Sequence, residues 1–424
     1  MEFVHMLTYF DPDLDRMRLP AEALDTVLSL TPTLPEEDVC LQDAAWRVLA
    51  RDIVATENHP PFPASTMDGY AVLSEDHSPW REVIGVQAAG SIVDVEVTPG
   101  TAVRIMTGAP MPRGADAVVR VENTEMADDH VIVNQESVSA GENIRPIGTD
   151  ISIKALVLKK GTVIGPPEIG LLATLGLDPV SVRRRPIVSV ISTGDELLEP
   201  SMAITPGKIR DSNRFSLLAA LNQAGAKVDW MGKGPDDRDH LHRLITDRIA
   251  KSDIVITSGG VSMGELDIIK ALLGDLAVVH FRRLALKPGK PLNFATAGKT
   301  LIFGLPGNPV SALVAFELFI RPAIRTMMGH PTATRPAINV ILAHDVQPTD
   351  RFEYQRAVIR QDRSGKLVAS TTGGQASSRL ASFTGANGLV ILPPRDLRYA
   401  AGEPVDAMLT GELMGASDQD SVPL

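Results

Sequence analysis

A glycine-rich turn near the middle of the chain has the residue types needed to hold an anion. An apolar run over residues 254–256 leads into this turn, residues 258–264, and an apolar segment with helical spacing follows. Where a strand, a glycine turn and a helix follow one another, backbone N–H groups converge and can bind a phosphate. Lys287 and Lys290 lie on a proline-stiffened loop and could add positive charge to the same place. The pattern predicts a binding site for a phosphate-bearing or carboxylate ligand.

The turn differs from the two common nucleotide-binding motifs. Gly259 and Gly264 have the spacing of a Walker A loop, but Glu265 and Leu266 stand where Lys and Ser/Thr are needed. The G-x-G-x-x-G fingerprint is also absent, so neither an ordinary P-loop NTPase nor an NAD enzyme fits. The alternative is a connecting turn that uses glycine only to adopt a positive φ. The adjoining lysine loop and the Pro-Gly-Asn-Pro turn at residues 306–309 argue against that alternative.

Carboxylates follow several of the expected strands, and they could hold a metal ion. They are Asp195, Glu196, Asp236 and Asp267. Oxygen ligands in a chain with a single cysteine suit Mg²⁺, which commonly bridges to a substrate phosphate. Loop acids are more often simply solvated, which is the alternative for any one of them. Their shared position after neighbouring strands favours a magnesium site.

Strands and helices alternate from residue 186 onward, and this pattern would position those side chains. Nearly continuous apolar strands, beginning at residues 186–191, are separated by segments of helical spacing as far as residue 328. Strands of this kind indicate a mostly parallel sheet that is covered by helices on both faces. Ligands of such sheets bind beyond the carboxyl ends of the strands, where the glycine turn and the acids fall.

The regions outside this α/β segment contain β-rich modules. Residues 54–150 hold short β runs broken by glycine and proline, and a β pattern returns between residues 338 and 409. We expect the helices near residues 19–28 and 167–175 to pack on each other, with the first β module inserted between them. That module has three polar turns, which could contribute to a site or only connect strands. They are residues 65–70, 107–110 and 143–145.

Composition excludes several classes of protein. The net charge of −11 argues against a general nucleic-acid surface. A single cysteine, Cys40, excludes an internal disulfide and a multi-cysteine zinc site. No apolar run reaches about 18 residues, so we expect no membrane span. Residues 1–18 are interrupted by acids and have no signal-peptide core, so we expect a cytoplasmic protein.

Motifs spread along the chain resemble the MoeA family of molybdopterin molybdenumtransferases, which is also found as the E domain of gephyrin. The motifs are MDGY, RIMTGAP, STGDEL, SGGVSMGELD, LKPGKP and GLPGNPVS. The resemblance runs from about residue 19 to residue 409. It implies an elongated multidomain chain of α/β class plus β modules. The central domain would be a doubly wound, mostly parallel sheet like that of MogA and MoaB, with an inserted β module and a small C-terminal β-barrel.

The expected domain bounds follow from the patterns and the resemblance together. They are residues 19–53 plus 152–184 for a discontinuous N-terminal domain, 54–151 for the inserted β domain, 185–333 for the α/β molybdopterin-binding domain, 334–412 for the barrel, and 1–18 and 413–424 for flexible ends.

The resemblance implies an enzyme of molybdenum cofactor synthesis. Members of the family insert molybdate into adenylylated molybdopterin and release AMP, with Mg²⁺ required, and they form homodimers with a composite active site. Molybdopterin adenylyltransferase and molybdoenzyme acceptors are the implied partners. Binding to nucleic acid or to a membrane is not expected. Two alternatives stay open, an enzyme like molybdopterin adenylyltransferase and a non-catalytic scaffold. The sequence does not decide between molybdate and tungstate.

The matching motifs also imply roles for individual residues. The catalytic residues would be Asp68, Thr107, Glu196, Asp236 and Asp267. The metal ligands would be Asp195, Glu196, Asp236 and Asp267. The substrate-binding residues would be Ser258, Gly259, Gly260, Ser262, Lys287, Lys290, Pro306, Asn308, Ser311, Arg145 and Asp150.

Overall fold

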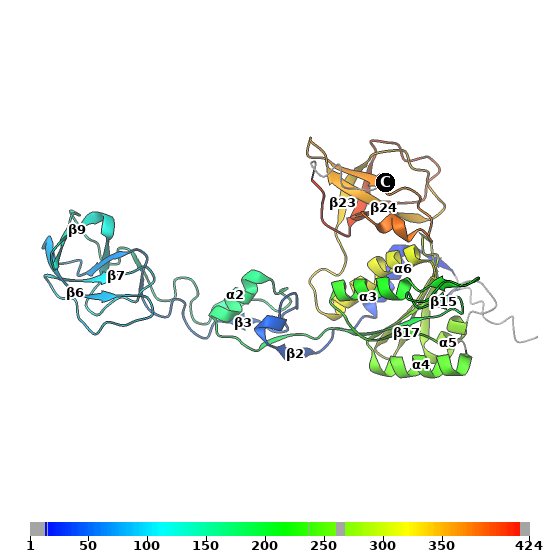
Figure 1. The fold of residues 1–424 in the computed structure, drawn as a ribbon, viewed down its shortest axis with the longest axis horizontal. Helices are drawn as coiled ribbons and strands as arrows, with labels where there is room; N and C mark the ends of the chain where they lie inside the picture. Colours follow the sequence, from blue (N-terminus) through cyan, green and yellow to red (C-terminus); the bar gives the residue numbers. More distant parts are fainter. Residues whose placement is uncertain (1–12, 15, 236, 260–267, 416–424) are drawn as a thin grey trace, which may run out of the picture.

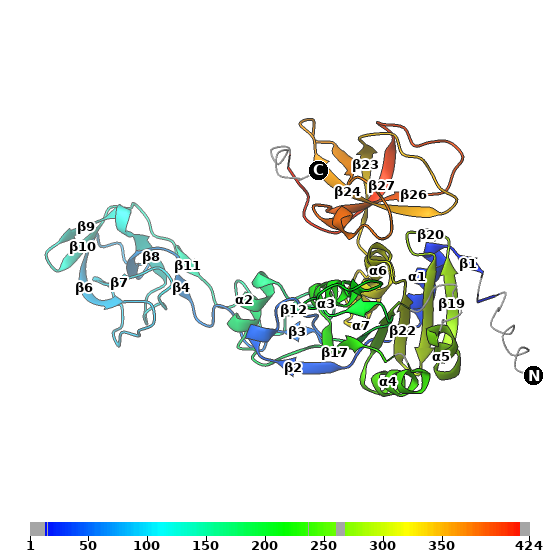
Figure 2. The same ribbon diagram turned by 45° about the vertical axis from the view of Figure 1, so that its right-hand side comes forward.

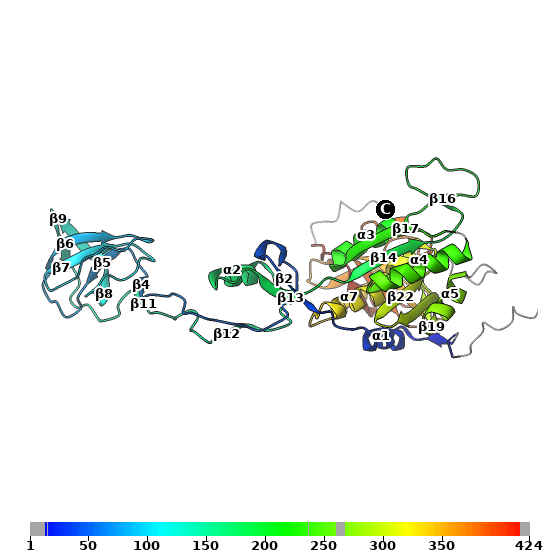
Figure 3. The same cartoon turned by 90° about the horizontal axis from the view of Figure 1, so that it is seen from below.

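The molecule is elongated, with a β module at one end and an α/β domain that carries a second β domain at the other (Figure 1). A smaller module lies between them in every view (Figure 2 and Figure 3). The computed structural model describes residues 13–14, 16–235, 237–259 and 268–415. The expected elongated, multidomain α/β architecture is confirmed.

The central sheet is seven-stranded and mostly parallel. Its order is β1 (Met17–Arg18), β19 (Val278–Leu284), β21 (Pro291–Ala297), β22 (Thr300–Leu305), β18 (Ile254–Ser258), β14 (Ile187–Ser192) and β17 (Lys227–Lys233). Only β21 runs against its neighbours. A small parallel pair, β15 (Leu197–Leu198) and β16 (Ile209–Arg210), lies in the connection after β14.

Helices cover both faces of this sheet, because successive residues of its strands point to opposite sides. Ile254 and Ile256 pack in one core cluster with α3 (Asn213–Ala224), α6 (Pro309–Ala315) and α7 (Arg321–Met327). Val255 packs in another cluster with α4 (Arg238–Lys251) and α5 (Ile268–Leu276). The expected doubly wound sheet is therefore confirmed.

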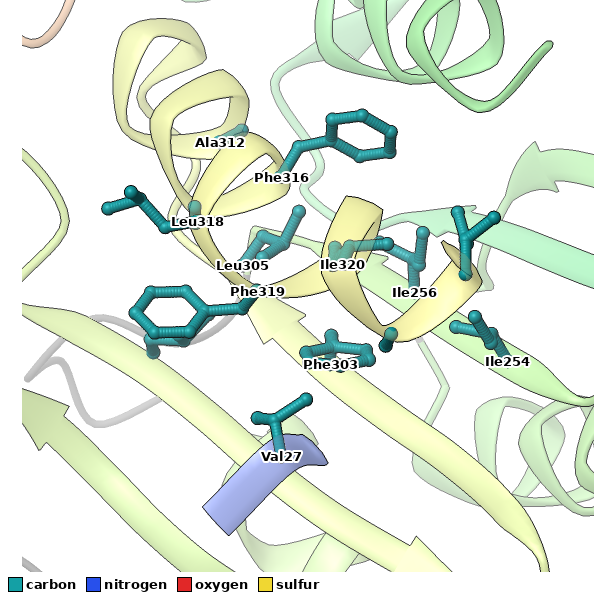
Figure 4. Packing of buried hydrophobic residues seen from close by; sticks show 14 of the residues in the cluster. Val27, Ile254, Ile256, Phe303, Leu305, Ala312, Phe316, Leu318, Phe319 and Ile320 are labelled. Atoms are coloured by element: carbon teal, nitrogen blue, oxygen red, sulfur yellow. The ribbon is translucent and has the colours of Figure 1, made fainter. Parts of the chain in front are cut away.

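Aromatic and branched side chains fill the larger of these two clusters (Figure 4). Phe303 of β22 lies beneath Phe319 and Ile320, which belong to a π-helical turn, Phe316–Ile320, between α6 and α7. Val27 of α1 (Pro20–Ser29) enters the same core and is fully buried.

The position of α1 corrects one expectation. The helix at residues 19–28 was expected to pack on the helix near 167–175, yet Ala23 and Val27 of α1 lie in the core of the α/β domain. Leu172 of α2 (Pro166–Thr174) packs in a separate cluster with Leu49 and Val182. The spacing of apolar residues shows that a helix has a buried face, but it does not say which surface covers that face.

The middle module is built from two stretches of chain far apart in sequence. Strand β2 (Glu36–Val39) pairs antiparallel with β13 (Val180–Arg183), and β3 (Ile53–Val54) pairs antiparallel with β12 (Leu156–Leu158). A 3-10 turn, Leu41–Asp43, packs near α2. Because the chain leaves through β3 and returns through β12, everything between them is an insertion.

That insertion is the distal β module. Its six-stranded sheet has the order β8 (Ala117–Arg120), β5 (Gly69–Val72), β7 (Thr101–Ile105), β6 (Trp80–Gln87), β10 (His130–Val133) and β9 (Thr124–Ala127), with a 3-10 turn at Val121–Asn123. A short pair, β4 (Ala64–Ser65) and β11 (Ile144–Arg145), closes the end nearer the middle module (Figure 2).

The C-terminal domain is the expected small β-barrel. Strands β24 (Phe352–Gln361), β25 (Leu367–Thr371), β23 (Ala337–Leu342), β27 (Pro404–Leu409) and β26 (Gly388–Leu392) pair in that order, and β26 pairs back onto β24. A 3-10 turn, Leu380–Phe383, precedes β26. Strand β20 (Leu286–Lys287), from the lysine loop, adds to β24 in parallel.

The N-terminal end of the chain also differs from expectation. Residues 1–18 were expected to be flexible, but Met17 and Arg18 pair with Arg283 and Leu284 of β19. At the other end, Gln361 donates its backbone N–H to the carbonyl of Met414 at 3.0 Å, and most of the end predicted to be flexible, residues 413–424, lies outside the described residues. Among the helices that the structure describes, none has the length and apolar character to cross a membrane.

We predict that Val27→Asp destabilises the α/β domain by about 3–5 kcal/mol, because it places an uncompensated charge in the core. The thermal unfolding temperature measures the effect. Ala21→Asp is the matched control, since residue 21 is exposed in the first turn of the same helix, where an acid is favoured. Equal melting temperatures for the two variants would contradict the packing of α1 in this core.

Candidate functional site

Three parallel strands of the central sheet end at the same level, which brings their following loops together. Ser192 of β14 pairs with Ser258 of β18, and Ser258 pairs with Leu305 of β22. The bonding continues into the loops, because Thr193 N donates to Ser258 O at 2.9 Å and Gly259 N donates to Leu305 O at 3.2 Å. This carboxyl edge is where a ligand of the sheet is expected.

Gly259 is required by the closeness of these loops. Its φ is +96°, and a Cβ atom on it would lie 2.3 Å from the carbonyl oxygen of Thr193. A Cβ on Gly307 would in turn lie 3.8 Å from the Cα of Gly259. The glycine turn therefore packs backbone against backbone at Gly259. The predicted ligands Gly260 and Ser262 lie outside the described residues.

Asn213, at the first position of α3, links two of the loops. Its Nδ2 donates to Ser258 Oγ and to the Gly307 carbonyl, both at 2.8 Å. The side chain is buried, and its Oδ1 has no hydrogen-bond partner among the described residues. The sequence analysis missed Asn213, because it lies some 45 residues from Ser258 and carries no local signal of its own.

The third loop continues into α6. Pro306 and Ser311 are buried, whereas Asn308 is exposed at the N-cap and its Nδ2 donates to Ser377 Oγ at 3.1 Å. Val310 N also donates to the Ser377 carbonyl at 3.1 Å. Because Ser377 belongs to the barrel domain, this contact closes the barrel against the start of α6.

The two lysines lie in different environments. Lys287 Nζ is 3.2 Å from Glu353 Oε1 of β24, and Glu353 is nearly inaccessible, with 4% of its side chain exposed. Lys290 is exposed. The pKa of Asp350 is lowered, first by a hydrogen bond from Arg351 and more weakly by the charge of Lys290. Lys287 is thus oriented by the barrel, while Lys290 faces solvent.

Polar groups of β24 lie buried behind Lys287, and the sequence analysis missed them. Arg356 is fully buried and donates from Nε to Ser382 Oγ at 2.9 Å. Burial lowers the pKa of Arg356 to about 10, although the charge of Glu353 opposes that shift. The other oxygen of Glu353, Oε2, has no hydrogen-bond partner among the described residues. The sequence of β24 mixes charged and amide residues with apolar ones, as a solvated strand does, so no local signal marked these groups as buried.

Two of the four predicted metal ligands can be placed. Asp195 and Glu196 follow β14 and are both exposed. Lys208 Nζ donates to the backbone carbonyl of Asp195 at 2.6 Å and not to its carboxylate. Asp236 and Asp267 lie outside the described residues. Within the described ranges, no three acidic, histidine or cysteine side chains group as a metal site.

The remaining predicted residues gather at one end of the distal β module. Asp68 Oδ1 accepts from Thr107 N at 2.7 Å and from Thr107 Oγ1 at 2.9 Å. These bonds lower the pKa of Asp68, with a smaller contribution from Arg104, so its carboxylate is ionised at neutral pH. Arg145 Nε donates to Asp150 Oδ1 at 3.1 Å. Strand β4 pairs with β11 beside both groups.

The predicted site residues thus fall into two separate places within one chain. One set lies at the carboxyl edge of the central sheet, and the other lies in the distal β module, with the middle module between them in all three views (Figure 1, Figure 2 and Figure 3). A single chain of this shape does not bring the two sets together.

Models of known protein families match most of the chain. Residues 19–176 match the MoeA N-terminal region (domain I and II), residues 189–326 match a probable molybdopterin binding domain, and residues 339–410 match the MoeA C-terminal region (domain IV).

Individual relatives show similarity over nearly the whole chain. Gephyrin of Dictyostelium discoideum is 37% identical over 89% of this chain, which spans 60% of that protein. The molybdopterin molybdenumtransferase of Bacillus subtilis is 37% identical, covering 90% of this chain and 91% of its own length. A crystal structure of the molybdopterin biosynthesis MoeA protein from Pyrococcus horikoshii is 30% identical and has a TM-score of 0.80, covering 94% of this chain and all of that one.

We predict that Gly259→Ala lowers the free energy of unfolding by about 1–3 kcal/mol, since alanine is strained at this positive φ and its Cβ would clash with Thr193. Thermal unfolding checks the effect. Gly274→Ala is the control, because a Cβ there meets nothing within 4 Å in α5, and alanine favours a helix by up to about 1 kcal/mol. A Gly259→Ala chain as stable as the control would show that the loops are not closely packed.

Proposed function

The chain belongs to the MoeA family, and on that premise we propose that it is a molybdopterin molybdenumtransferase. It would insert molybdate into adenylylated molybdopterin and release AMP, completing the molybdenum cofactor. The observation that carries this proposal is the convergence of the loops after β14, β18 and β22 beside the lysine loop, where a Cβ on Gly289 would lie 3.9 Å from the carbonyl oxygen of Ser311. Lys287 and Lys290 would present ammonium groups to an anionic ligand there, and backbone N–H groups of the glycine turn, most of which lies outside the described residues, would complete the anion site.

Two lysines would bind the substrate, one held in a fixed position and one free to move. Lys287 is held by Glu353, so its position is set before a ligand arrives. Lys290 is exposed and can move to meet a phosphate. Ser258, Gly259, Pro306, Asn308 and Ser311 line the loops on which the phosphates and the pterin would lie.

The carboxylates of the site would not attract the substrate, because carboxylates repel a phosphate. Their role would be to hold a cation. Asp195 and Glu196 are exposed oxygen donors at the carboxyl edge, and a hard cation such as Mg²⁺ suits that donor set. Asp236 and Asp267, from the matching motifs, would complete it. Bound Mg²⁺ would offset the negative charge of the phosphate, which these carboxylates would otherwise repel. Asp267 would also orient the oxyanion that displaces AMP.

The active site would be composite, formed by two copies of the chain. Asp68 and Thr107 lie in the distal module, as do Arg145 and Asp150, far from the lysine loop of their own chain (Figure 1). In a homodimer, the distal module of one copy would lie over the carboxyl edge of the other. Asp68, ionised at neutral pH, would then face the reacting groups. Molybdopterin adenylyltransferase would supply the substrate in the cytoplasm, and molybdoenzymes would accept the product.

We predict that Lys290→Ala weakens binding of adenylylated molybdopterin by about 10- to 150-fold, because one charge-assisted contact contributes about 1.5–3 kcal/mol. Titration calorimetry gives the dissociation constant, and released AMP gives the rate. Lys299→Ala is the matched control, because Lys299 is exposed in the turn between β21 and β22, away from the carboxyl edge. An unchanged dissociation constant would exclude Lys290 from the site. Release of pyrophosphate instead of AMP would favour the adenylyltransferase alternative.

We predict that Lys290→Ala and Asp68→Ala chains complement each other in a mixed dimer. Each variant alone impairs both sites of its homodimer, but a mixed dimer has one site with neither change. Random mixing of two such chains restores roughly a quarter of the wild-type activity. Molybdate insertion after mixing, unfolding and refolding measures it. Mixed samples no more active than the separate variants would contradict a site shared between chains.

A further inference from the structure

A group of positive side chains near the end of the α/β domain lies outside the site described above. The helix from Pro309 to Met327 is continuous but changes type, because a π-helical turn, Phe316–Ile320, separates α6 from α7. Pro322 has no N–H to donate and its ring would clash with the carbonyl of Leu318 in a regular helix, which accounts for the wide turn. Such turns occur frequently at functional sites.

The π turn places Glu317 and Arg321 beside Arg335 of the linker that leads to the barrel. Glu317 is occupied by Arg335, whose Nε and NH2 donate to its two oxygens at 2.8 and 3.3 Å. Arg321 Nε lies 4.0 Å from Glu317, beyond hydrogen-bond distance. Arg325, one turn further on, donates from Nε to the Thr332 carbonyl at 2.9 Å. Among the described residues no carboxylate pairs with Arg325, so the group has an excess of two positive charges.

Two nitrogen atoms in this group are buried without hydrogen-bond partners in the described part of the chain. Arg321 NH1 and His330 Nδ1 are both inaccessible to solvent and have no hydrogen-bond partner among the described residues. Burial, then the charge of Arg335, lowers the pKa of Arg321 to about 10. Burial, then the charges of Arg325 and Arg321, lowers the pKa of His330 to about 4, so this imidazole is neutral at physiological pH. Unpaired buried donors and crowded like charges both cost stability.

Ordinary structural roles explain only part of the group. Arg325 lies in the last turn of α7, where a cation interacts favourably with the helix dipole. Arg335 holds the linker through Glu317. Neither role applies to Arg321, which lies at the first position of α7; its ion pair with Glu317 is 4.0 Å long, and Glu317 already accepts hydrogen bonds from Arg335. An anion between Arg321, Arg325 and His330 would accept from Arg321 NH1, and from His330 in the tautomer that carries its proton on Nδ1, and would balance the charge.

The group also lies where separate parts of the chain meet. Leu34 N donates to the Met327 carbonyl at 2.8 Å, and Arg183 of the middle module packs against Gly329, where a Cβ would lie 3.4 Å from its Cγ. Two residues beyond Arg335, β23 opens the barrel. A bound ion here would contact the α/β domain beside the connections to both neighbouring domains.

We propose that Arg321, Arg325 and His330 form a binding site for a small tetrahedral oxyanion, of the class of phosphate and sulfate, separate from the site at the carboxyl edge. Its role is to join the α/β domain to the linkers on either side. The inference does not depend on the proposed transferase activity.

Equilibrium dialysis with radiolabelled inorganic phosphate tests the proposal on the full chain. The Lys290→Ala background weakens phosphate binding at the lysine loop, so remaining binding reports the arginine group. We expect about one phosphate per chain in Lys290→Ala, and at least a tenfold weaker affinity after Arg321→Gln is added, because a charge-assisted contact is lost. Arg363→Gln is the control, since Arg363 is exposed in the barrel. Equal phosphate binding with and without Arg321→Gln would overturn the proposal.

Thermal unfolding gives an independent measurement. At equal ionic strength, replacing chloride by saturating phosphate should raise the melting temperature of Lys290→Ala by about 2–4 °C more than that of Lys290→Ala with Arg321→Gln. The general stabilisation by phosphate is common to both chains and cancels. In chloride, Arg321→Gln should change the melting temperature little, because burial disfavours this charge and its ion pair with Glu317 is 4.0 Å long. If Arg321→Gln fails to fold, Arg325→Gln replaces it, and an undiminished phosphate effect in that variant would overturn the proposal.

Discussion

The register of three parallel strands is the constraint on which the site depends. Because Ser192, Ser258 and Leu305 pair side by side, the loops that follow begin at one level and meet over a short distance. Backbone groups of these loops then bond to each other, and Asn213 joins Ser258 to Gly307. A shift of one residue in β18 would turn its buried residues to the wrong face and separate the loops. The two apolar clusters on either side of the sheet therefore hold the site together as well as the domain.

The barrel domain takes part in the same site through the lysine loop. Strand β20 leaves the α/β domain and pairs with β24, which places Lys287 against Glu353. A loop stiffened only by proline would still move, whereas one hydrogen-bonded into a neighbouring sheet has its direction set by that sheet. Contacts of Ser377 with Asn308 and Val310 fix the barrel from the other side. The orientation of the barrel and the position of the lysine are thus linked.

The distal module raises a different physical problem. Its polar residues are ordered locally, since Asp68 is held by Thr107 and Arg145 by Asp150. Their distance from the carboxyl edge in the same chain nevertheless means that they can reach a ligand there only from another copy. The middle module, made from two antiparallel strand pairs, is what sets that distance.

The sequence by itself determined much about this protein. Alternating apolar strands and helical segments specified the doubly wound sheet, because burial on both faces requires continuous apolar strands. Local signals also specified the positive φ at Gly259, the lysine loop and the barrel, since glycine, proline and period-two patterns act over a few residues. The tertiary structure alone decided that α1 packs in the α/β core, that β20 joins the barrel, and that Asn213 and Glu353 support the site. Each of those outcomes pairs side chains or strands that are far apart in the chain. Such partners are selected by the complementary shape and chemistry of two surfaces, which the local spacing of residues does not record.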